Sequence, residues 1–364
     1  MKILYQDFFN FLKGYFLNWL SYHLNYPFVK PWRVNFDVTH ACPLRCKMCR
    51  IWRMPRKGKE MSIEDAKKLV DQIAAWGIDH ISFAGGETLV RKDFTVELIE
   101  YASSKNIRTD LITSGVLLDE ELCERLMDAG LSKISLSVDG ATKETHDYIR
   151  GEGTFEKIMR VAEILKTLKE EKKSNIELEF TTVIMGLNFE ELVDIFELMV
   201  SKGFDYITYQ VVVPDNTFTQ PLEFFKKFYE SEFWIKPENI PKLRRICEQL
   251  IEIKKKTGKI RNTRGYLRKI PEYFEKKEKF KPGKCIAGYS YLNIDPYGNI
   301  NICGIGPNLN VIGKDLRKIW KSKEYKRTRI LIKKCKRPCL MLCYEKLEFF
   351  PLLEAWLELR GWVK

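Results

Sequence analysis

Hydrophobic and polar positions repeat with two different periods after Pro31. Short runs rich in β-branched and aromatic residues alternate with longer stretches whose apolar residues recur at helical spacing. The runs predicted as strands are 33–39, 79–84, 107–112, 132–138, 175–184 and 204–213, and the stretches predicted as helices are 62–76, 92–104, 118–129, 154–171 and 188–202. Ser62 with Asp65, and Asn188 with Glu191, predict capping boxes at two helix starts. Six strands interleaved with helices predict an α/β fold with a parallel sheet, as a barrel or an open sheet.

Residues 1–31 are predicted to form an amphipathic helix. Eleven of the first 32 residues are aromatic, against 13% of the whole chain, but there is no compact apolar stretch and no A-x-A-like cleavage site. The small or polar positions are Asp7, Asn10, Gly14, Asn18 and Ser21, and the opposite face holds Leu4, Phe8, Phe11, Leu12, Tyr15, Phe16 and Trp19. Such a helix either lies on a membrane surface or packs its aromatic face on the barrel.

The strand–helix rhythm stops after Pro214. The next segment is basic and helical in pattern, and a solvated helical surface is a better interpretation of it than a nucleic-acid site. The predicted organisation is 1–31 amphipathic helix, 32–217 barrel, 218–283 basic helical connector, 284–345 cysteine-containing domain and 346–364 amphipathic segment.

Composition excludes two classes of protein. With 45% hydrophobic and 30% charged residues the chain is not disordered, and no uncharged apolar run approaches the length of a membrane span. The 62 Lys and Arg against 49 Asp and Glu give a net charge of +13, which favours anionic partners such as a membrane surface, nucleic acid or an acidic peptide.

Eight of the ten cysteines fall into two groups. The first is Cys42, Cys46 and Cys49, and the second is Cys285, Cys303, Cys335, Cys339 and Cys343. Cys123 and Cys247 lie in helical patterns and are interpreted as buried packing residues. Because no signal peptide is recognisable, clusters at short spacing indicate metal binding rather than disulfides.

The first group is a C-x3-C-x2-C motif directly after the first strand. In a barrel this places the loop on the face where active sites lie. Three thiolates can bind three irons of a [4Fe–4S] cluster and leave the fourth iron open to a substrate or cofactor. A zinc site would need a fourth ligand, for which His40 is the nearest candidate.

This motif, together with Gly85-Gly86-Glu87 at the end of the second strand, resembles the radical S-adenosylmethionine (SAM) superfamily over about residues 33–215. The resemblance implies a partial (β/α)6 TIM-like barrel and a catalytic [4Fe–4S] cluster whose open iron binds SAM. It also implies reductive cleavage of SAM to a 5'-deoxyadenosyl radical, which abstracts a hydrogen atom from the substrate.

The resemblance assigns further residues to SAM. The run Gly85-Gly86-Glu87 matches the family's GGE run, which accepts hydrogen bonds from the methionyl ammonium of SAM. Ser137 and Arg150, within S-V-D-G and H-D-Y-I-R-G, match residues that hold the methionyl carboxylate, with a helix cap and a surface ion pair as the alternatives. Ser114 is a candidate for the ribose and Gly186 for the adenine. Thr88 and Met48 depart from residues common in relatives, proline and an aromatic residue.

The second group resembles the auxiliary-cluster domains called SPASM and Twitch. A full SPASM domain has seven cysteines and two clusters, whereas five cysteines suffice for one [4Fe–4S] cluster with one thiol spare, so the shorter Twitch form fits better. The alternative is a zinc knuckle that uses four of the five. An auxiliary cluster would relay an electron or shape the pocket.

We therefore expect a radical SAM enzyme with two [4Fe–4S] clusters and an electron donor such as ferredoxin or flavodoxin. The aromatic ends and the positive charge suggest a lipid chain as substrate and a cytoplasmic protein attached peripherally to the anionic inner face of the cell membrane. The alternatives are a peptide-modifying maturase, against which the lack of a recognisable leader-peptide module weighs, or an auxiliary-cluster alcohol dehydrogenase. A cluster-containing nucleic-acid-binding protein is the non-enzyme alternative and is not favoured.

Overall fold

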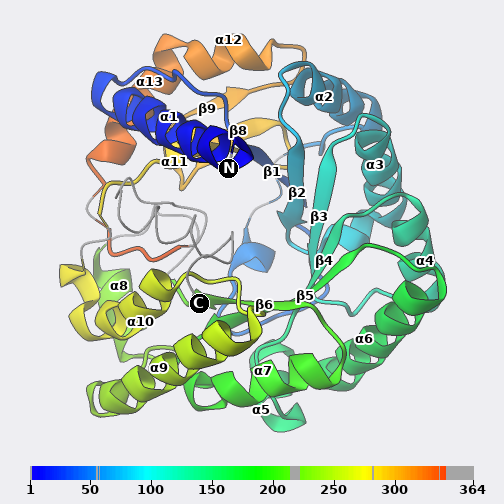
Figure 1. The fold of residues 1–364 in the computed structure, drawn as a ribbon, viewed down its shortest axis with the longest axis vertical. Helices are drawn as coiled ribbons and strands as arrows, with labels where there is room; N and C mark the ends of the chain where they lie inside the picture. Colours follow the sequence, from blue (N-terminus) through cyan, green and yellow to red (C-terminus); the bar gives the residue numbers. More distant parts are fainter. Residues whose placement is uncertain are drawn as a thin grey trace.

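The computed structural model describes residues 2–54, 56, 58–213, 222–280, 283–335 and 337–341. Its centre is one sheet with the strand order β6-β5-β4-β3-β2-β1-β7-β8-β9. The first six strands, all parallel, are β1 (Arg33–Thr39), β2 (His80–Gly85), β3 (Arg108–Thr113), β4 (Lys133–Ser137), β5 (Glu177–Ile184) and β6 (Tyr206–Val211). The sheet curves as an open barrel with helices on its outer side (Figure 1), which confirms the predicted α/β fold.

The helices that follow the strands lie near their predicted positions. They are α2 (Ile63–Ala75), α3 (Lys92–Ser104), α4 (Glu120–Asp128), α5 (Lys143–Arg150), α6 (Thr154–Glu171) and α7 (Leu192–Ser201), with short 3-10 turns at Ile51–Arg53, Thr88–Arg91 and Phe189–Glu191. In β1 the alternate residues Val34, Phe36 and Val38 are buried in the main core, which is the pattern of a strand with one face against helices. The other face of each strand lines the inside of the barrel.

The C-terminal elements continue the same sheet. Strand β7 (Tyr291–Ile294) pairs in parallel with β1, and β8 (Asn299–Ile302) and β9 (Ile305–Asn310) follow as antiparallel neighbours. Helices α11 (Ala287–Ser290), α12 (Leu316–Lys321) and α13 (Lys323–Lys333) accompany them. Strands β7 and β8 flank a turn at Tyr297-Gly298-Asn299, and the pairing of β1 with β7 joins the barrel to the cysteine-containing segment.

The predicted connector is helical, as expected from its pattern. It contains α8 (Leu222–Glu230), α9 (Ile240–Thr257) and α10 (Arg264–Lys276), with 3-10 turns at Pro237–Asn239 and Lys277–Lys279. These helices lie at the opposite end of the curved sheet from α1, α12 and α13 (Figure 1). The segment 346–364 lies outside the described residues.

One of the two predicted capping boxes is wrong. The Ser62 hydroxyl accepts a hydrogen bond from Asp65 N at 3.2 Å and caps α2, as predicted. Asn188 makes no cap bond; its amide donates to the carbonyls of Asp139 and Val183, and its Oδ1 accepts from Met185 N. Backbone groups at the buried ends of β4 and β5 need hydrogen-bond partners. Pairing them with the Asn188 side chain stabilises the fold more than a cap at the helix start would.

Helix α1 (Lys2–Leu24) packs on the C-terminal elements near its C-terminal end, with Tyr15 beside the contact. Ser21 is fully buried, and Tyr22 lies in a small cluster with Ile286 and Tyr289. Phe16 is 56% exposed and Trp19 39% exposed. The alternative in which the aromatic face covers the barrel is therefore wrong for these two residues. No helix in the described part of the chain is long and apolar enough to cross a membrane.

Candidate active site at the cysteine loop

The loop with Cys42, Cys46 and Cys49 leaves the end of β1 and is held on one side by the end of β2. Gly86 N donates to the Thr39 carbonyl at 2.7 Å, and Glu87 N donates to the Ala41 carbonyl at 2.8 Å. A Cβ added to Gly86 would lie 2.3 Å from the Ala41 oxygen. Glycine is therefore required here because two backbones touch. The predicted contact of this run with SAM remains a prediction.

On its other side the loop is held by the C-terminal end of α5. Lys47 N donates to the Ile149 carbonyl at 2.9 Å, and the Cys46 thiol lies 3.8 Å from the Arg150 carbonyl oxygen. The Lys47 ammonium lies 3.0 Å from the centre of the Tyr148 ring. The H-D-Y-I-R-G motif thus supports the cysteine loop directly.

The three thiols are close enough to affect one another. Burial raises the pKa of Cys46 to about 11, Arg150 acts in the opposite direction, and Cys49 and Cys42 raise it further. Burial also raises the pKa of Cys42. No set of three or more His, Cys, Asp or Glu in the described ranges is arranged around a single ion. A [4Fe–4S] cluster differs because each thiolate binds its own iron, and three thiols on one loop fit that group.

Glu87 is buried and connects β2 with the end of β3. Its Oε1 accepts from the Thr113 hydroxyl at 2.7 Å, and its Oε2 accepts from Ser114 N at 2.8 Å and from the Ser114 hydroxyl. The structure therefore brings two predicted site residues, Glu87 and Ser114, together.

Ser137 and Arg150 occupy the next positions around the barrel. Ser137 ends β4 and does not cap α5, whose N-cap is Thr142, so the helix-cap alternative is wrong. The Arg150 Nε donates to Asp139 Oδ2 at 2.7 Å, and both side chains are buried. Burial lowers the pKa of Arg150, but the Asp139 carboxylate, together with Cys46 and Cys49, acts in the opposite direction and the pKa is raised. The Arg150–Asp139 ion pair is thus buried rather than on the surface. Arg150 would therefore have to bind the methionyl carboxylate of SAM through N–H groups other than Nε–H.

Sequence reasoning missed the residues that organise this side of the site. Asp139 also accepts from Val183 N at 2.7 Å. Asp147 accepts from Gly153 N, Phe155 N and the Thr154 hydroxyl, and so fixes the start of α6. Both carboxylates stand in motifs that the sequence shows, Asp139 in S-V-D-G and Asp147 in H-D-Y-I-R-G. Their hydrogen-bond partners, however, are set by the tertiary fold.

The inner face of the barrel is polar. Lys133 Nζ lies 3.3 Å from Asp110 and 3.4 Å from Glu179, and His80 Nε2 lies 2.8 Å from Asp110. Near the cysteine loop, burial and the neighbouring Asp295 raise the pKa of Asp37 to about 7, although Asn293 hydrogen-bonds to it. Asp110, Lys133 and Glu179 form a paired network across β3, β4 and β5, toward the N-terminal ends of these strands and on the side of the sheet away from its helices.

Other candidates lie elsewhere. Gly186 N donates to the Phe233 carbonyl, and a Cβ at Gly186 would lie 2.5 Å from the Glu232 oxygen, so this glycine lets the connector approach the barrel.

Cys123 and Cys247 are buried, as predicted, and burial raises the pKa of each to about 12.

The second cysteine group lies around the C-terminal strands and helices. Cys285 precedes α11, Cys303 follows β8, and Cys335 follows α13. Cys339 lies farther along the same segment, and Cys343 lies outside the described residues. None of the described cysteines forms a disulfide.

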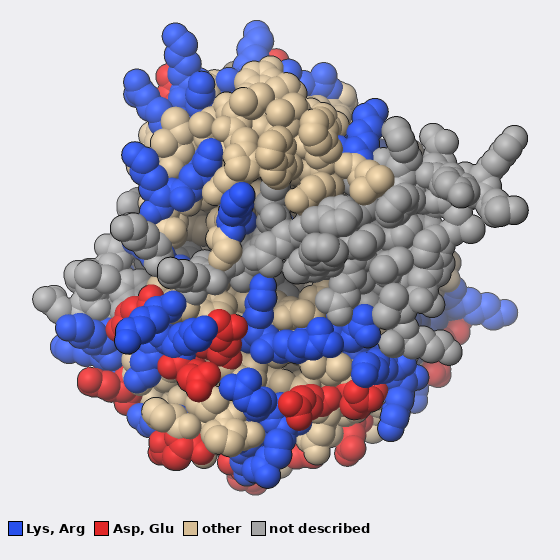
Figure 2. Space-filling view, turned by 60° about the vertical axis from the view of Figure 1, so that its left-hand side comes forward, with Lys and Arg blue, Asp and Glu red and all other residues tan. Residues whose placement is uncertain are grey.

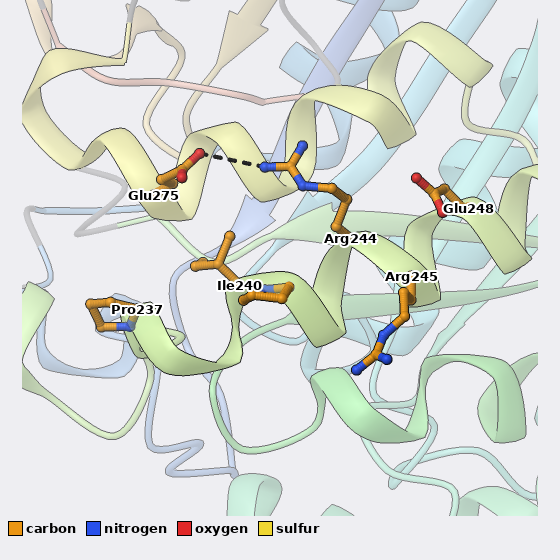
Figure 3. A pocket seen from close by; sticks show the side chains of 7 residues that line it. Pro237, Ile240, Arg244, Arg245, Glu248 and Glu275 are labelled. Atoms are coloured by element: carbon orange, nitrogen blue, oxygen red, sulfur yellow. Dashed lines mark ion pairs between the residues drawn. The ribbon is translucent and has the colours of Figure 1, made fainter.

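A surface hollow of about 480 Å³ lies away from the cysteine loop, beside the connector (Figure 3). It is lined by Pro237, Ile240, Pro241, Arg244, Arg245, Glu248 and Glu275. Arg244 lies 3.5 Å from Glu275 across it. Its walls come from the outer connector helices, so we do not assign the chemistry to it.

Comparison with known proteins agrees with this geometry. The sequence profile of the radical SAM superfamily matches residues 36–199, from β1 into α7. Residues 36–199 are a radical SAM domain. The chain is therefore an enzyme with a radical SAM domain, and this superfamily implies SAM and a [4Fe–4S] cluster.

The similarity extends beyond that domain. The AdoMet-dependent heme synthase of Methanosarcina barkeri is 29% identical over 313 residues, 81% of this chain and 83% of that protein. The PqqA peptide cyclase of Rhodopseudomonas palustris is 27% identical over 336 residues, 88% of this chain and 81% of that protein. The structure of native anSMEcpe with bound AdoMet and Cp18Cys peptide has a TM-score of 0.63 and 19% identity, covering 84% of each chain, and shows a shared fold.

Proposed function

We propose that this radical SAM enzyme modifies a peptide. The observation that carries the proposal is the cysteine loop at the carboxyl end of β1, in a chain similar to PqqA peptide cyclase over 88% of its length. The similarity to PqqA peptide cyclase and the fold shared with a peptide-bound enzyme support the same class of substrate.

A lipid chain, which we first expected as substrate, fits this interior less well. The Asp110–Lys133–Glu179 network, whose charges are paired with one another, offers no apolar surface to a lipid chain. The comparisons also favour a peptide over a lipid. Phe16 and Trp19 of α1, two of the aromatic residues that suggested a lipid substrate, are exposed.

A tetrapyrrole is the second candidate, because of the similarity to the heme synthase. Tetrapyrroles of that kind carry carboxylates, which favour cationic pockets. Lys133, the lysine of this interior network, is already paired with Asp110 and Glu179, so the network offers no free cation to those carboxylates.

The cysteine loop would hold the catalytic cluster through Cys42, Cys46 and Cys49. With the bound cluster, SAM supplies a 5'-deoxyadenosyl radical that abstracts hydrogen. The Gly85–Glu87 run would accept hydrogen bonds from the methionyl ammonium, and Ser137 and Arg150 would hold the carboxylate. Ser114, whose backbone N–H donates to Glu87, would bind the ribose hydroxyls.

We also propose one auxiliary [4Fe–4S] cluster held by four of Cys285, Cys303, Cys335, Cys339 and Cys343. Electrons would come from a ferredoxin or flavodoxin. An auxiliary cluster next to β7 would lie beside the same strand, β1, that carries the catalytic loop, because β7 and β1 are paired.

Deuterium transfer can identify the substrate class. Cells of the source organism are grown in deuterated medium, and their peptide, lipid and tetrapyrrole fractions are separately incubated with reconstituted enzyme, SAM and dithionite. We expect deuterium in 5'-deoxyadenosine, measured by mass spectrometry, only with the peptide fraction. Transfer from the lipid or tetrapyrrole fraction instead would contradict the proposal.

A further inference from the structure

Helices α12 and α13 present a strongly cationic surface. Residues 314–334 expose two acidic side chains, Asp315 and Glu324, and eight basic ones. The basic side chains are Lys314, Arg317, Lys318, Lys321, Lys323, Lys326, Arg327 and Lys334. Between the described residues, none of these eight forms an ion pair, whereas Lys172, for example, pairs with Glu124 and Asp128. Like charges held side by side repel, so this surface favours an external anion.

Helical geometry puts these cations on one side. In α13 the buried residues Tyr325, Thr328, Arg329 and Ile332 recur at spacings of three and four and face the protein. The opposite side of the helix carries basic residues at the same kind of spacing: Lys323, Lys326, Arg327 and Lys334. The outward side of α13, here called the cationic stripe, therefore carries cations at both ends, with Ile330 and the 46% exposed Leu331 between Arg327 and Lys334.

The aromatic face of α1 belongs to the same lobe. Lys333, at the end of α13, donates to the Tyr22 carbonyl at 2.6 Å and to Asn25 Oδ1 at 2.9 Å. The ammonium groups of Lys333 and Lys284 lie 4.5 and 5.9 Å from the centre of the Tyr22 ring. The α1 helix is therefore fixed to the end of the cationic stripe by direct contacts.

Apolar side chains project outward from this junction. The rings of Phe16 and Trp19 stack at 6.2 Å, and Leu24 is 56% exposed. Tyr26 and Phe28 form a second exposed ring pair at 5.0 Å. In Figure 2 the upper lobe, which holds α1, α12 and α13, shows a tan area bordered by blue side chains with little red, whereas the lower part mixes blue and red.

We propose that this face, the outer side of α1 with the cationic stripe of α12 and α13, binds an anionic lipid bilayer. Aromatic side chains enter the headgroup region of a bilayer, and lysine and arginine beside them attract anionic lipids. An acidic soluble protein would pair with the cations but would leave the Phe16, Trp19 and Leu24 side chains in water. This inference does not depend on the substrate inside the barrel.

Vesicle flotation of the full, reconstituted chain tests it. We expect binding to vesicles of phosphatidylcholine with phosphatidylglycerol, and at least ~10-fold weaker binding to phosphatidylcholine alone, because each basic residue near the surface contributes to the attraction. The K323E/K326E/R327E variant should lose binding by at least ~10-fold. The matched control K173E/K255E/K256E makes the same change of charge at exposed sites elsewhere and should bind like the wild type.

A second pair of variants tests the aromatic contribution. F16S/W19S should also float poorly, while V90S/V200S, which changes exposed apolar residues on the barrel, should not. Circular dichroism and iron content show whether F16S/W19S is folded. If F16S/W19S is not folded, the comparison of K323E/K326E/R327E with K173E/K255E/K256E alone tests the proposal. The proposal is overturned if wild type does not bind anionic vesicles, or if K323E/K326E/R327E binds as well as its control. It is also overturned if wild type fails to bind vesicles while K323E/K326E/R327E slows reduction by flavodoxin, since the partner is then an acidic protein.

Discussion

His146 and Asp37 are two titratable residues whose effects on stability oppose each other. Burial, and then Arg150, lower the pKa of His146 to about 3, and its Nδ1 accepts from Asp139 N at 3.3 Å. Between about pH 6.5 and 3 the unfolded chain therefore binds a proton that the folded chain does not, and stability falls as the pH falls. Asp37, with a pKa of about 7, behaves in the opposite way: its contribution falls as the pH rises from about 4 to 7.

We predict that His146→Gln and Asp37→Asn tilt the pH dependence of stability in opposite directions. Between pH 4.5 and 6.5, each group contributes a slope of up to ~1.4 kcal/mol per pH unit, and the two largely cancel in the wild type. The free energy of unfolding of His146→Gln should therefore fall with rising pH, and that of Asp37→Asn should rise. Urea unfolding at several pH values measures both slopes; two variants with the wild-type slope would refute the shifted pKa values.

Gly86 is the residue at which the smallest change should damage the site. We predict that Gly86→Ala costs about 1–3 kcal/mol of stability and lowers the iron bound after reconstitution, because its Cβ would push on the Ala41 carbonyl. Gly14→Ala is the control, since nothing lies within 4 Å of a Cβ there. Equal melting temperatures and iron contents for the two variants would show that the β2 end does not support the cysteine loop.

Among the elements, the β7–β8 hairpin positions Cys303 and extends the sheet. Asp295 holds its turn by accepting from Tyr297 N at 2.9 Å, from Asn299 N at 2.8 Å and from the Asn299 amide. We predict that Asp295→Ala costs about 1–3 kcal/mol and reduces iron at the auxiliary site selectively. Asp315→Ala, which removes the N-cap of α12, should cost about 1 kcal/mol without loss of iron. Unchanged iron content in Asp295→Ala would separate the hairpin from the cluster.

The elements themselves could be predicted from the sequence because their signals are local. Strand β1 and helix α6 begin and end where the pattern placed them. The orientation of α1 could not be predicted, because its periodicity defines two faces but not which one meets Ile286 and Tyr289, more than 250 residues away. The hydrogen bonds of Asn188 and the Arg150–Asp139 ion pair could not be predicted either, because only the folded sheet brings these residues together.

In the whole molecule, one strand connects the two cysteine groups. Strand β1 leads into the catalytic loop and pairs with β7 of the C-terminal segment. We predict that replacing Cys42, Cys46 and Cys49 together by alanine leaves about four irons per chain at the second group, following the four-cysteine rule for such clusters. Iron and zinc analysis after anaerobic reconstitution measures this; zinc, or no metal, in that variant would remove the auxiliary cluster from the account.

Formation of 5'-deoxyadenosine from SAM tests the central claim most directly. The reconstituted wild type is incubated with SAM and dithionite without oxygen, beside the triple cysteine variant and a Cys123→Ala control, which changes a buried packing thiol. The account predicts 5'-deoxyadenosine from wild type and from Cys123→Ala, and none above background from the triple variant. Cleavage that persists in the triple variant would contradict the assignment of the cysteine loop as the catalytic site.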